Sequence, residues 1–344
     1  MAKKTSKPTA RRKKAVLPAG EPVETVAVVA AAEPQPAEKA KAVKKGEGGI
    51  DIVVPMVFAS DEVWMRTYKE ACEKAGIRPV VNERYRSWNL ERYFFRGIEK
   101  FMPFVRNVHL IVSNEEQVPY WLDRSKVHVV LHKDIIPEDL LPTFNSSTIE
   151  MWLHNIEGLS ETFVYCNDDM IAVAPMTAED FFVDGKPVTR CDERRVPISG
   201  VFLEMVRQEM ELIGKEYGKT FDEGVTLRDS HSYSPQLLSV LRETVEKYGD
   251  VMKASCTPFR EGRNMNQYIY TYRMWLGGMC TGNCHTHKYY NISYDYDKME
   301  KEILGGGISV ACFNDSGTGS WYEAQQRIYG VLQKVLGEKS GFEV

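Results

Sequence analysis

The sequence predicts an α/β fold with a mainly parallel sheet, because short apolar runs of strand length alternate with longer segments of helical spacing. Its 43% apolar and 27% charged residues are typical of a soluble globular protein with a buried core. The composition changes abruptly near residue 50, where a segment rich in Ala, Pro, Lys and Glu ends and aromatic and branched aliphatic residues begin. We therefore expect one folded domain over 50–344.

Residues 1–49 are predicted to form a disordered, basic, low-complexity tail. They contain almost no large apolar side chains, so burial would not offset the entropy lost on ordering them. A mitochondrial transit peptide is the alternative, although frequent Pro and Glu residues count against it. The basic side chains, among them Lys3, Lys4, Arg11 and Arg12, could also contact an anionic membrane surface.

Charge, hydropathy and cysteine content exclude several classes of protein. The formal net charge of −4 argues against a protein that coats nucleic acid, and no apolar run reaches the roughly 18 residues of a transmembrane helix. The seven cysteines are an odd number and lie mostly singly in apolar runs, as reduced interior cysteines do. We expect a cytoplasmic protein without a nucleic-acid partner, peripheral to the inner face of the membrane if the tail binds lipid.

The predicted elements begin with a buried strand at Ile52–Val57. Ser60 and Asp61 are candidate N-caps for a helix that ends before Gly76. A second helix is predicted over Leu90–Phe101. Further along the chain we expect strands at His109–Val112, Val127–Leu131 and Phe163–Cys166, and a helix over Pro235–Lys247 with Ser234 as its N-cap.

Two segments, about 183–226 and 280–308, are predicted to be variable insertions in the domain. The second contains side chains that could bind zinc, namely Cys280, Cys284, His285 and His287. The spacing differs from the usual Cys-x₂-Cys, and the neighbouring residues 284 and 285 rarely both reach one ion. The pattern therefore does not favour a structural zinc site, and it leaves the question open.

An acidic turn follows one of the predicted strands. Asn167, Asp168 and Asp169 come directly after Phe163–Cys166, and ligands of parallel sheets bind beyond the carboxyl ends of the strands. Carboxylate and amide oxygens suit Mg²⁺ or Mn²⁺ bridging phosphate oxygens, which is the charge neutralisation that phosphoryl transfer needs. Asp168 and Asp169 are thus candidate metal ligands. An ordinary turn is the alternative, because Asn and Asp favour turns.

Upstream of the acidic turn, Ser147 and Glu150 have the spacing of a capping box. The functional alternative is a helix N-terminus that faces an anion, with Asn145 and Ser146 donating hydrogen bonds to it.

Three other features have both a structural and a functional interpretation. Arg92 and Arg96 lie one helical turn apart and form either a solvated face or a diphosphate clamp. His231 lies in a predicted loop, where it is either structural or merely exposed, or a general base, because an imidazole can accept a proton near neutral pH. The segment Cys312–Ser316 repeats the pattern of a strand followed by a polar turn, so it could bring a second amide and carboxylate to the same cleft.

These motifs together resemble the Stealth family of sugar-phosphate transferases, which includes bacterial capsular polysaccharide phosphotransferases and the catalytic part of the lysosomal-enzyme N-acetylglucosamine-1-phosphotransferase. The resemblance is strongest over Arg84–Phe182 and extends over about 51–344 with two variable gaps. The matching segments are Arg92–Tyr93, Ile98–Lys100, Pro103–Asn107, Leu141–Ser146, Ile149–Glu150, Gly158–Ser160 and Asn167–Asp169, and then His231 with Pro235, Phe259–Arg260, Asn264, Phe313–Asp315 and Glu338–Glu343.

The resemblance implies a Rossmann-like glycosyltransferase-type core. It also implies transfer of a hexose-1-phosphate from a nucleotide diphosphate sugar, UDP-linked in our interpretation, to a carbohydrate hydroxyl. The phosphodiester product would serve capsular or other cell-surface polysaccharide synthesis. An ordinary glycosyltransferase and a non-catalytic nucleotide-sugar-binding protein are the alternatives.

Residues carried over from the family divide into two groups. Those expected at the reacting phosphate are Glu150, Asp168, Asp169, His231, Arg260 and Asn314. Those expected to bind the donor are Asp51, Arg92, Arg96, Asn145 and Ser146. The resemblance makes His231 the provisional general base, with Asp168 or Asp169 as the alternative, and Arg260 with the Arg92 and Arg96 pair would neutralise the diphosphate.

The first family block is where the chain departs from the pattern. The family reads roughly Asp-Ile-Val-Tyr-Thr-Trp-Val-Asp-Gly-Ser-Asp, whereas this chain reads Asp51-Ile-Val-Val-Pro55-Met56-Val-Phe58-Ala59-Ser60-Asp61. Met56 replaces Trp, and Phe58-Ala59 replaces the Asp-Gly turn. Because that block is expected to help hold the nucleotide, the preference for base and sugar stays open.

Overall fold

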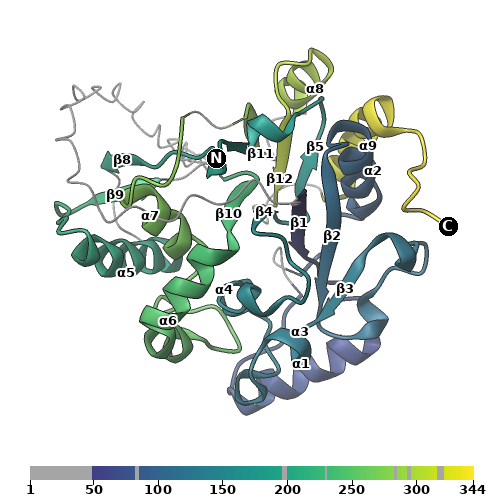
Figure 1. Cartoon of the computed structure of the whole chain (residues 1–344). Helices are drawn as coiled ribbons and strands as arrows, with labels where there is room; N and C mark the ends of the chain where they lie inside the picture. The colour runs from purple at the N-terminus through teal and green to yellow at the C-terminus, as the bar shows by residue number, and fades with distance from the viewer. Residues whose placement is uncertain are drawn as a thin grey trace, which may run out of the picture. The chain divides into compact units, whose positions relative to one another are not determined.

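The structure is a computed structural model that describes residues 49–81, 85–195, 200–228, 231–282, 285–292, 296–315 and 321–344. Residues 1–48, almost the whole of the predicted tail, lie outside the described residues, so the tail and its boundary stay predictions. Figure 1 labels the elements of the described part.

A central sheet of five strands organises the fold, in the order β10-β4-β1-β2-β3. Strand β1 pairs in parallel with β2 and with β4, β2 pairs in parallel with β3, and β10 is antiparallel on the edge. The predicted α/β class with a mainly parallel sheet is therefore confirmed. The strands span Ile50–Pro55 (β1), Val105–Val112 (β2), His128–Leu131 (β3), Thr162–Tyr165 (β4) and Ser234–Leu237 (β10).

A second sheet has three strands in the order β11-β12-β5, and β12 lies parallel to β11 and antiparallel to β5. Its strands span Met170–Ala172 (β5), His287–Asn291 (β11) and Val310–Asn314 (β12). Two further pairs are antiparallel: β6 (Phe182–Val183) with β7 (Lys186–Pro187), and β8 (Asp192–Arg195) with β9 (Val225–Arg228).

Helices flank these sheets (Figure 1). They span Glu62–Lys74 (α1), Glu91–Phe101 (α2), His132–Ile135 (α3), Ser146–Glu150 (α4), Val201–Glu216 (α5), Leu238–Ser255 (α6), Tyr268–Leu276 (α7), Tyr296–Leu304 (α8) and Trp321–Leu336 (α9). Short 3₁₀ helices lie at Glu115–Gln117, Arg124–Lys126, Glu138–Leu140, Leu153–Asn155 and Ala178–Asp180.

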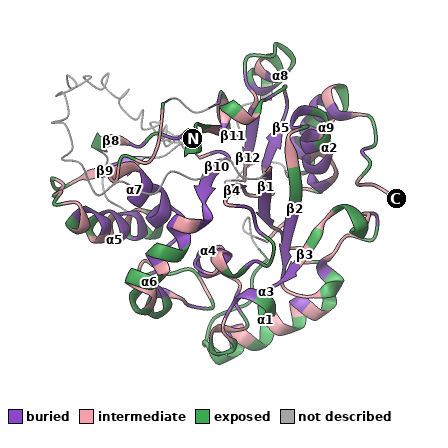
Figure 2. Cartoon of the chain, viewed as in Figure 1, coloured by how far each residue is buried: buried purple, intermediate pink, exposed green. Residues whose placement is uncertain are grey.

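The buried core lies on both faces of the central sheet, as the purple strands of Figure 2 illustrate. Along β1, Ile52 and Val54 pack into one apolar cluster with α2 and α9, whereas Val53 packs into a second cluster with α5, α6 and α7. Side chains of a strand alternate between the two faces, so a strand buried on both sides needs a continuous apolar run. The run from Ile52 to Val54 supplies it.

Helix α2 lies close to the second sheet and to α9. Gly97 allows this approach, because a Cβ atom there would lie 2.6 Å from the carbonyl oxygen of Ala172 in β5. The helix begins one residue later than predicted, at Glu91, and its partly polar face carries Arg92 and Arg96.

The predicted helix over Pro235–Lys247 is wrong at its start. Ser234–Leu237 form the edge strand β10, and the helix α6 begins at Leu238. Pro235 has no N–H to donate, which a strand at the edge of a sheet tolerates. The Ser-Pro pair that resembles a helix start is thus equally compatible with an edge strand, and pairing with β4 decides between them.

The segments predicted as insertions contain regular structure. Residues 183–226 include the helix α5 and most of the β8–β9 pair, and 280–308 include β11 and α8, which packs on α9. Within the described residues no helix is both long and apolar enough to cross a membrane. The six described cysteines form no disulfide with one another, and four of them, Cys72, Cys166, Cys191 and Cys312, are buried.

Candidate active site

A pocket of about 380 Å³ opens at the carboxyl ends of β1 and β4. After β1 the chain forms β2 and β3 on one side, and β4 is added on the other side of β1. This reversal of strand order leaves a crevice beyond the two strand ends, which is where open α/β sheets bind ligands. Its walls include the end of β1 with the two residues after it, Pro55–Val57, and the turn after β4, Asn167–Asp169.

The acidic turn Asn167–Asp169 joins the two sheets, because β4 precedes it and β5 follows it. The end of β12 lies against this turn: the backbone N–H of Phe313 donates to the carbonyl oxygen of Asp169 at 2.9 Å. Asn314 and Asp315 consequently line the same pocket. The prediction that the second polar turn brings an amide and a carboxylate to the cleft is confirmed.

The two aspartates of the turn both have raised pKa values. Burial raises the pKa of Asp168 to about 8, and the neighbouring charges of Asp169 and Glu91 add to the shift. Burial also raises the pKa of Asp169, while the charge of His231 acts in the opposite direction. The Oδ1 atom of Asp169 is buried without a hydrogen-bond partner among the described residues. Both carboxylates are only partly open to the pocket, and a positively charged ligand would relieve their repulsion.

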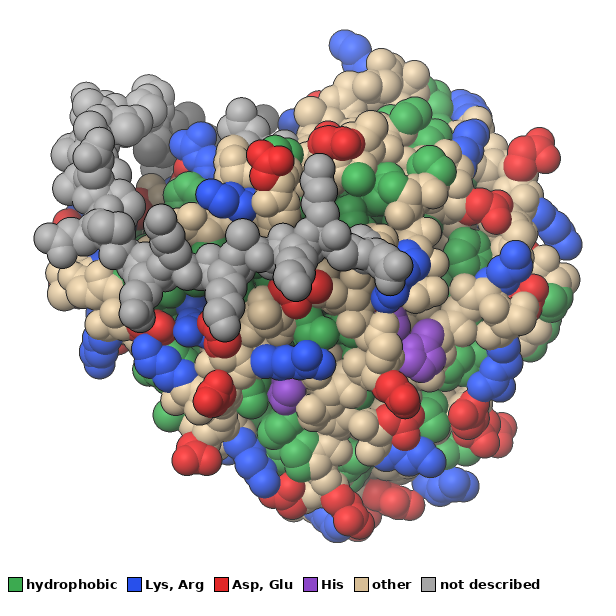
Figure 3. Space-filling view, viewed as in Figure 1, with side chains coloured by type: hydrophobic (Ala, Val, Ile, Leu, Met, Phe, Trp, Pro, Cys, Tyr) green, Lys and Arg blue, Asp and Glu red, His purple; other side chains and the backbone are tan. Residues whose placement is uncertain are grey.

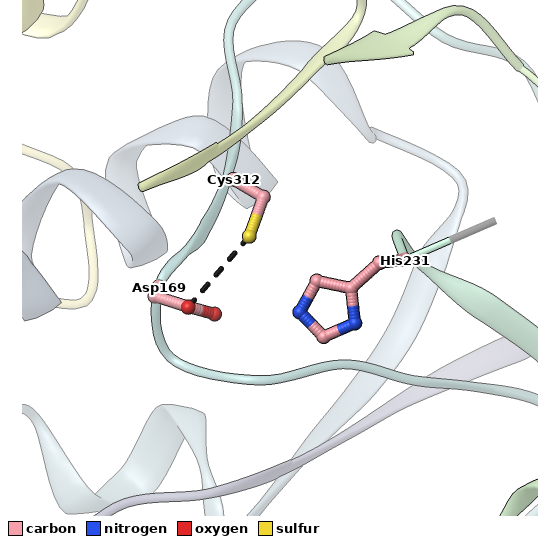
Figure 4. A group of neighbouring side chains, drawn as sticks. All are labelled: Asp169, His231 and Cys312. Carbon is pink, nitrogen blue, oxygen red and sulfur yellow. Dashed lines mark hydrogen bonds between the residues drawn. The ribbon is translucent and has the colours of Figure 1, made fainter. Parts of the chain in front are cut away.

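His231 reaches the acidic turn from the residues before β10. Ligand atoms of Asp169, His231 and Cys312 all lie within 4.8 Å of one another, and Figure 4 shows the three side chains converging. The Sγ atom of Cys312 donates to Oδ2 of Asp169 at 3.6 Å. The structure thus brings together Asp169 and His231, which the sequence could only place on separate segments.

Arg260 contributes positive charge to the pocket, where its guanidinium donates to Oγ of Ser146. Asn145 also lines the pocket, but both polar atoms of its side chain make hydrogen bonds within the protein. Its Nδ2 donates to Oδ1 of Asn264 at 3.0 Å, and its Oδ1 accepts from the N–H of Ser147. Asn145 therefore caps the five-residue helix α4, and Ser146 is the more exposed of the two predicted donor-binding residues.

Glu150, which the resemblance places at the reacting phosphate, is not among the residues that line this pocket. Its side chain is buried and accepts a hydrogen bond of 2.9 Å from the hydroxyl of Tyr165 and another of 2.9 Å from the backbone N–H of Gln267. Glu150 thereby joins α4 to β4 and to the start of α7. The capping box predicted for Ser147 and Glu150 is wrong, because Asn145 is the N-cap.

Arg92 and Arg96 likewise lie outside the pocket lining. Arg96 donates to both carboxylate oxygens of Glu343, at 2.6 and 2.9 Å, and Arg92 donates to the same carboxylate at 2.8 Å. Burial alone would raise the pKa of Glu343, but these bonds lower it to about 2. The arginine pair therefore clamps the C-terminal segment onto α2, and its expected contact with a diphosphate stays a prediction.

Asp51 lies near the start of β1, and the pocket opens at the other end of that strand. Its buried carboxylate accepts from Nε and Nη2 of Arg106 at 2.9 and 2.7 Å, lies 3.0 Å from Nε2 of His109, and accepts from the backbone N–H of Ser160 at 2.9 Å. Asp51 therefore lies away from this pocket, and its expected contact with the donor stays a prediction. It fixes the start of β1 to the neighbouring strands.

Several pocket residues, among them Arg86, Trp88 and Trp64, were missed by sequence reasoning. Asp315 accepts hydrogen bonds from Nε of Arg86 at 2.9 Å and from Nε1 of Trp88 at 3.0 Å, so it ties the segment before α2 to the end of β12. Trp64 packs against Phe144 at the pocket wall with ring centroids 5.5 Å apart. The dense run of aromatic and basic residues at 85–88 is a signal that could have identified this wall.

Of the four candidate zinc ligands considered from the sequence, Cys280, His285 and His287 form no group of three coordinating side chains among the described residues, and the question of a zinc site there stays open. Nε2 of His285 lies 2.7 Å from Oγ of Ser232, and Cys284 lies outside the described residues. Among the described residues, the group of coordinating side chains that comes together is Asp169, His231 and Cys312. Figure 3 shows acidic and basic side chains intermixed over the visible face, in keeping with the small net charge.

Comparison with known proteins identifies the family. The family profile described as Stealth protein CR2, conserved region 2, matches residues 84–189. The capsular polysaccharide phosphotransferase WcwK of Streptococcus pneumoniae is 30% identical over 329 residues, which cover 86% of this chain and 98% of that protein. The exopolysaccharide phosphotransferase cps2G of Lactiplantibacillus plantarum is 40% identical over 177 residues, which cover 51% of each chain.

Among solved structures, the galactosyltransferase LgtC in complex with donor and acceptor sugar analogs matches with 15% identity and a TM-score of 0.38, covering 83% of this chain and 96% of that one. The family assignment depends on the sequence relatives, since the WcwK match extends over nearly all of that protein. The chain belongs to the Stealth family of sugar-phosphate transferases.

Proposed function

We propose that this enzyme transfers a hexose-1-phosphate from a nucleotide diphosphate sugar, UDP-linked, to a carbohydrate hydroxyl, and that the phosphodiester serves capsular or other cell-surface polysaccharide synthesis. One observation carries the proposal: a single pocket combines a pair of half-buried carboxylates, a histidine and an arginine. The phosphotransferase names of WcwK and cps2G support the same reaction class. The pocket volume of about 380 Å³ falls in the roughly 300–1,000 Å³ range of small-molecule sites.

In the proposed reaction the acceptor hydroxyl oxygen attacks the phosphorus that carries the sugar. A new P–O bond forms to the acceptor, the bond from that phosphorus to the bridging oxygen of the diphosphate breaks, and a nucleoside monophosphate leaves. His231 accepts the hydroxyl proton, and its proximity to Asp169 favours the imidazolium that results. Arg260, held by Ser146, neutralises charge on the transferred phosphoryl group.

The carboxylate pair fits a divalent cation, Mg²⁺ or Mn²⁺. Asp168 and Asp169 repel one another, and Asp169 keeps a buried oxygen without a hydrogen-bond donor among the described residues. The two carboxylates would hold the ion, which would supply charge neutralisation at the diphosphate. Asn314 lines the same wall and would orient either the ion or the donor through its amide.

The donor would occupy the pocket along the end of β1. Met56 and Trp64 supply apolar surface there, which suits a nucleobase or sugar ring, and Ser146 lies on the side of Arg260. The cytoplasmic location and the membrane contact of the basic tail belong to the same proposal, because a cell-surface polymer is built at the membrane. Cosedimentation with vesicles rich in anionic lipid tests that contact, which removal of residues 1–48 should abolish.

The nucleotide released by the wild-type protein separates the proposal from its alternatives. Incubation with UDP-linked sugars, Mg²⁺ and an oligosaccharide acceptor should release a nucleoside monophosphate. An ordinary glycosyltransferase, which transfers the sugar alone, would release the diphosphate instead. Tight donor binding without turnover would favour the non-catalytic binding protein.

A further inference from the structure

Three side chains of different chemistry converge beside the acidic turn. The candidate ligand atoms of Asp169, His231 and Cys312 lie within 4.8 Å of one another, and the Cys312 sulfur is already 3.6 Å from Oδ2 of Asp169 (Figure 4). A set of one oxygen, one nitrogen and one sulfur suits zinc and similar transition metals better than Mg²⁺, which prefers oxygen ligands alone.

The surroundings hold these groups in place. Cys312 lies in β12, where its pairing partner across the sheet is Met170, the residue after Asp169. The Cys312 side chain is buried, and Oδ1 of Asp169 is buried without a hydrogen-bond donor among the described residues. A buried carboxylate oxygen without a partner costs free energy, and a bound cation would remove that cost. Two of the three groups are therefore fixed relative to one another before any ion binds.

We propose that Asp169, His231 and Cys312 bind one Zn²⁺ ion, and that this ion inhibits the enzyme. Zinc bonds of about 2.0–2.3 Å require the three ligand atoms to draw together by about 1 Å from their widest present separation. The Cys312 thiol releases its proton to solvent as its sulfur binds. Three protein ligands leave a fourth position, which water or a phosphate oxygen of the donor would take.

The inhibitory effect rests on the proposed function. Zinc on His231 occupies the nitrogen lone pair that would accept the acceptor's proton, and zinc on Asp169 takes a carboxylate from the proposed Mg²⁺ site. Binding of the ion and transfer of the sugar phosphate would thus exclude one another. Millimolar Mg²⁺ would not produce this effect, because Mg²⁺ has little affinity for thiolate and imidazole.

Cobalt reports directly on the thiolate ligand. The full-length chain without an affinity tag is titrated with Co²⁺, and we expect a thiolate-to-cobalt charge-transfer band that saturates at one ion per chain and that Zn²⁺ removes. Cys312→Ser should abolish the band. Asp169→Asn and His231→Ala should each weaken Co²⁺ binding by about 100-fold, since even loss of an outer partner of a metal ligand costs roughly 10–100-fold.

Cys280→Ser is the matched control, because it removes a cysteine of the other candidate zinc cluster and should leave the band intact. Near-ultraviolet circular dichroism and thermal melting establish that Cys312→Ser is folded. No band in the wild type, or a band that survives in folded Cys312→Ser, overturns the proposed site. Loss of the band in Cys280→Ser has the same meaning, because it places the metal elsewhere.

Inhibition is measured as the rate of sugar-phosphate transfer at increasing zinc concentrations. The rate of each protein is divided by the rate of the same protein without zinc. The zinc concentration for half-inhibition should rise at least about tenfold in Cys312→Ser relative to the wild type. Equal inhibition of both proteins contradicts the inhibitory role. Absence of sugar-phosphate transfer by the wild type counts against the proposed function, and the cobalt titration, which needs neither donor nor acceptor, still tests the zinc site.

Discussion

The backbone N–H of Phe313 donates a 2.9 Å hydrogen bond to the carbonyl oxygen of Asp169, and this bond joins the two polar turns that form the pocket. One turn ends a strand of the central sheet, and the other ends a strand of the second sheet. The site therefore depends on the packing of both sheets, and its acidic pair is held where α/β folds bind ligands.

Replacement of His231 by Ala should lower kcat by about 10²–10⁴-fold, the usual contribution of a general base, while donor binding persists. His154→Ala is the control, since His154 lies outside the pocket lining and should retain the wild-type rate. Initial rates measure kcat and calorimetry measures donor affinity, so together they distinguish a loss of proton transfer from a loss of donor binding. An unchanged kcat in His231→Ala would assign proton transfer to another group, with Asp168 or Asp169 as the next candidates.

Glu150→Gln should mainly lower the free energy of unfolding, with little effect on kcat. The amide can accept one hydrogen bond with its oxygen, but its NH₂ group cannot accept from the Gln267 N–H, and a lost bond to a charged group costs about 1.5–3 kcal/mol. Urea unfolding measures this loss, and Glu157→Gln, at an exposed position, should be nearly neutral. A drop in kcat at least tenfold with unchanged stability would instead place Glu150 in the catalytic machinery.

Arg96→Lys should destabilise the protein by about 1.5–3 kcal/mol, because lysine cannot reproduce the two-pronged contact with Glu343. The KM for the donor should not change. Arg124→Lys is a matched control: its ion pair with Glu115 is exposed at both ends, so its effect should stay within about 0.5 kcal/mol. A large rise in donor KM in Arg96→Lys would restore the diphosphate-clamp interpretation.

The Asp51 carboxylate should contribute to the free energy of unfolding, and this contribution should be lost in acid. Burial alone would raise its pKa, but hydrogen bonds from Arg106, His109 and Ser160 outweigh burial and lower it to about 2. Because the folded pKa lies below the unfolded value, the stabilisation is present above about pH 4 and is lost as the pH falls toward 2.

The measurement compares the unfolding free energies of the wild type and Asp51→Asn across this range of pH. Their difference should be largest near pH 7 and should shrink between about pH 4 and pH 2. Asp250→Asn, at an exposed position on α6, should show no such trend. A difference that stays constant down to pH 2 would contradict the role of the Asp51 charge.

Local sequence patterns predicted much of the fold. Helix α2 was expected at Leu90–Phe101 and spans Glu91–Phe101, and the strand before the acidic turn was displaced by one residue. These elements follow from apolar spacing and turn residues, which are properties of neighbouring positions. The edge strand β10 was missed because Ser234 and Pro235 begin helices and edge strands alike, and only pairing with β4 decides.

The candidate site was predictable to the extent that its residues follow strand ends. Asp168 and Asp169 lie in the short turn after β4, and Asn314 ends β12, so their meeting in one pocket follows from the direction of the strands. The partners of Arg96 and Asp51 could not be predicted in this way. Their ion pairs join residues far apart in the chain, and the spacing of charges along a helix or strand carries no information about them.

The fate of the phosphate that carries the sugar tests the proposed reaction most directly. A donor with radioactive phosphorus at the β position is incubated with the wild-type enzyme, divalent cation and acceptor, and the label is traced to the products. We predict that the label appears in the acceptor product as a phosphodiester, together with an unlabelled nucleoside monophosphate. Label that stays in a released nucleoside diphosphate, with unlabelled sugar on the acceptor, would contradict sugar-phosphate transfer.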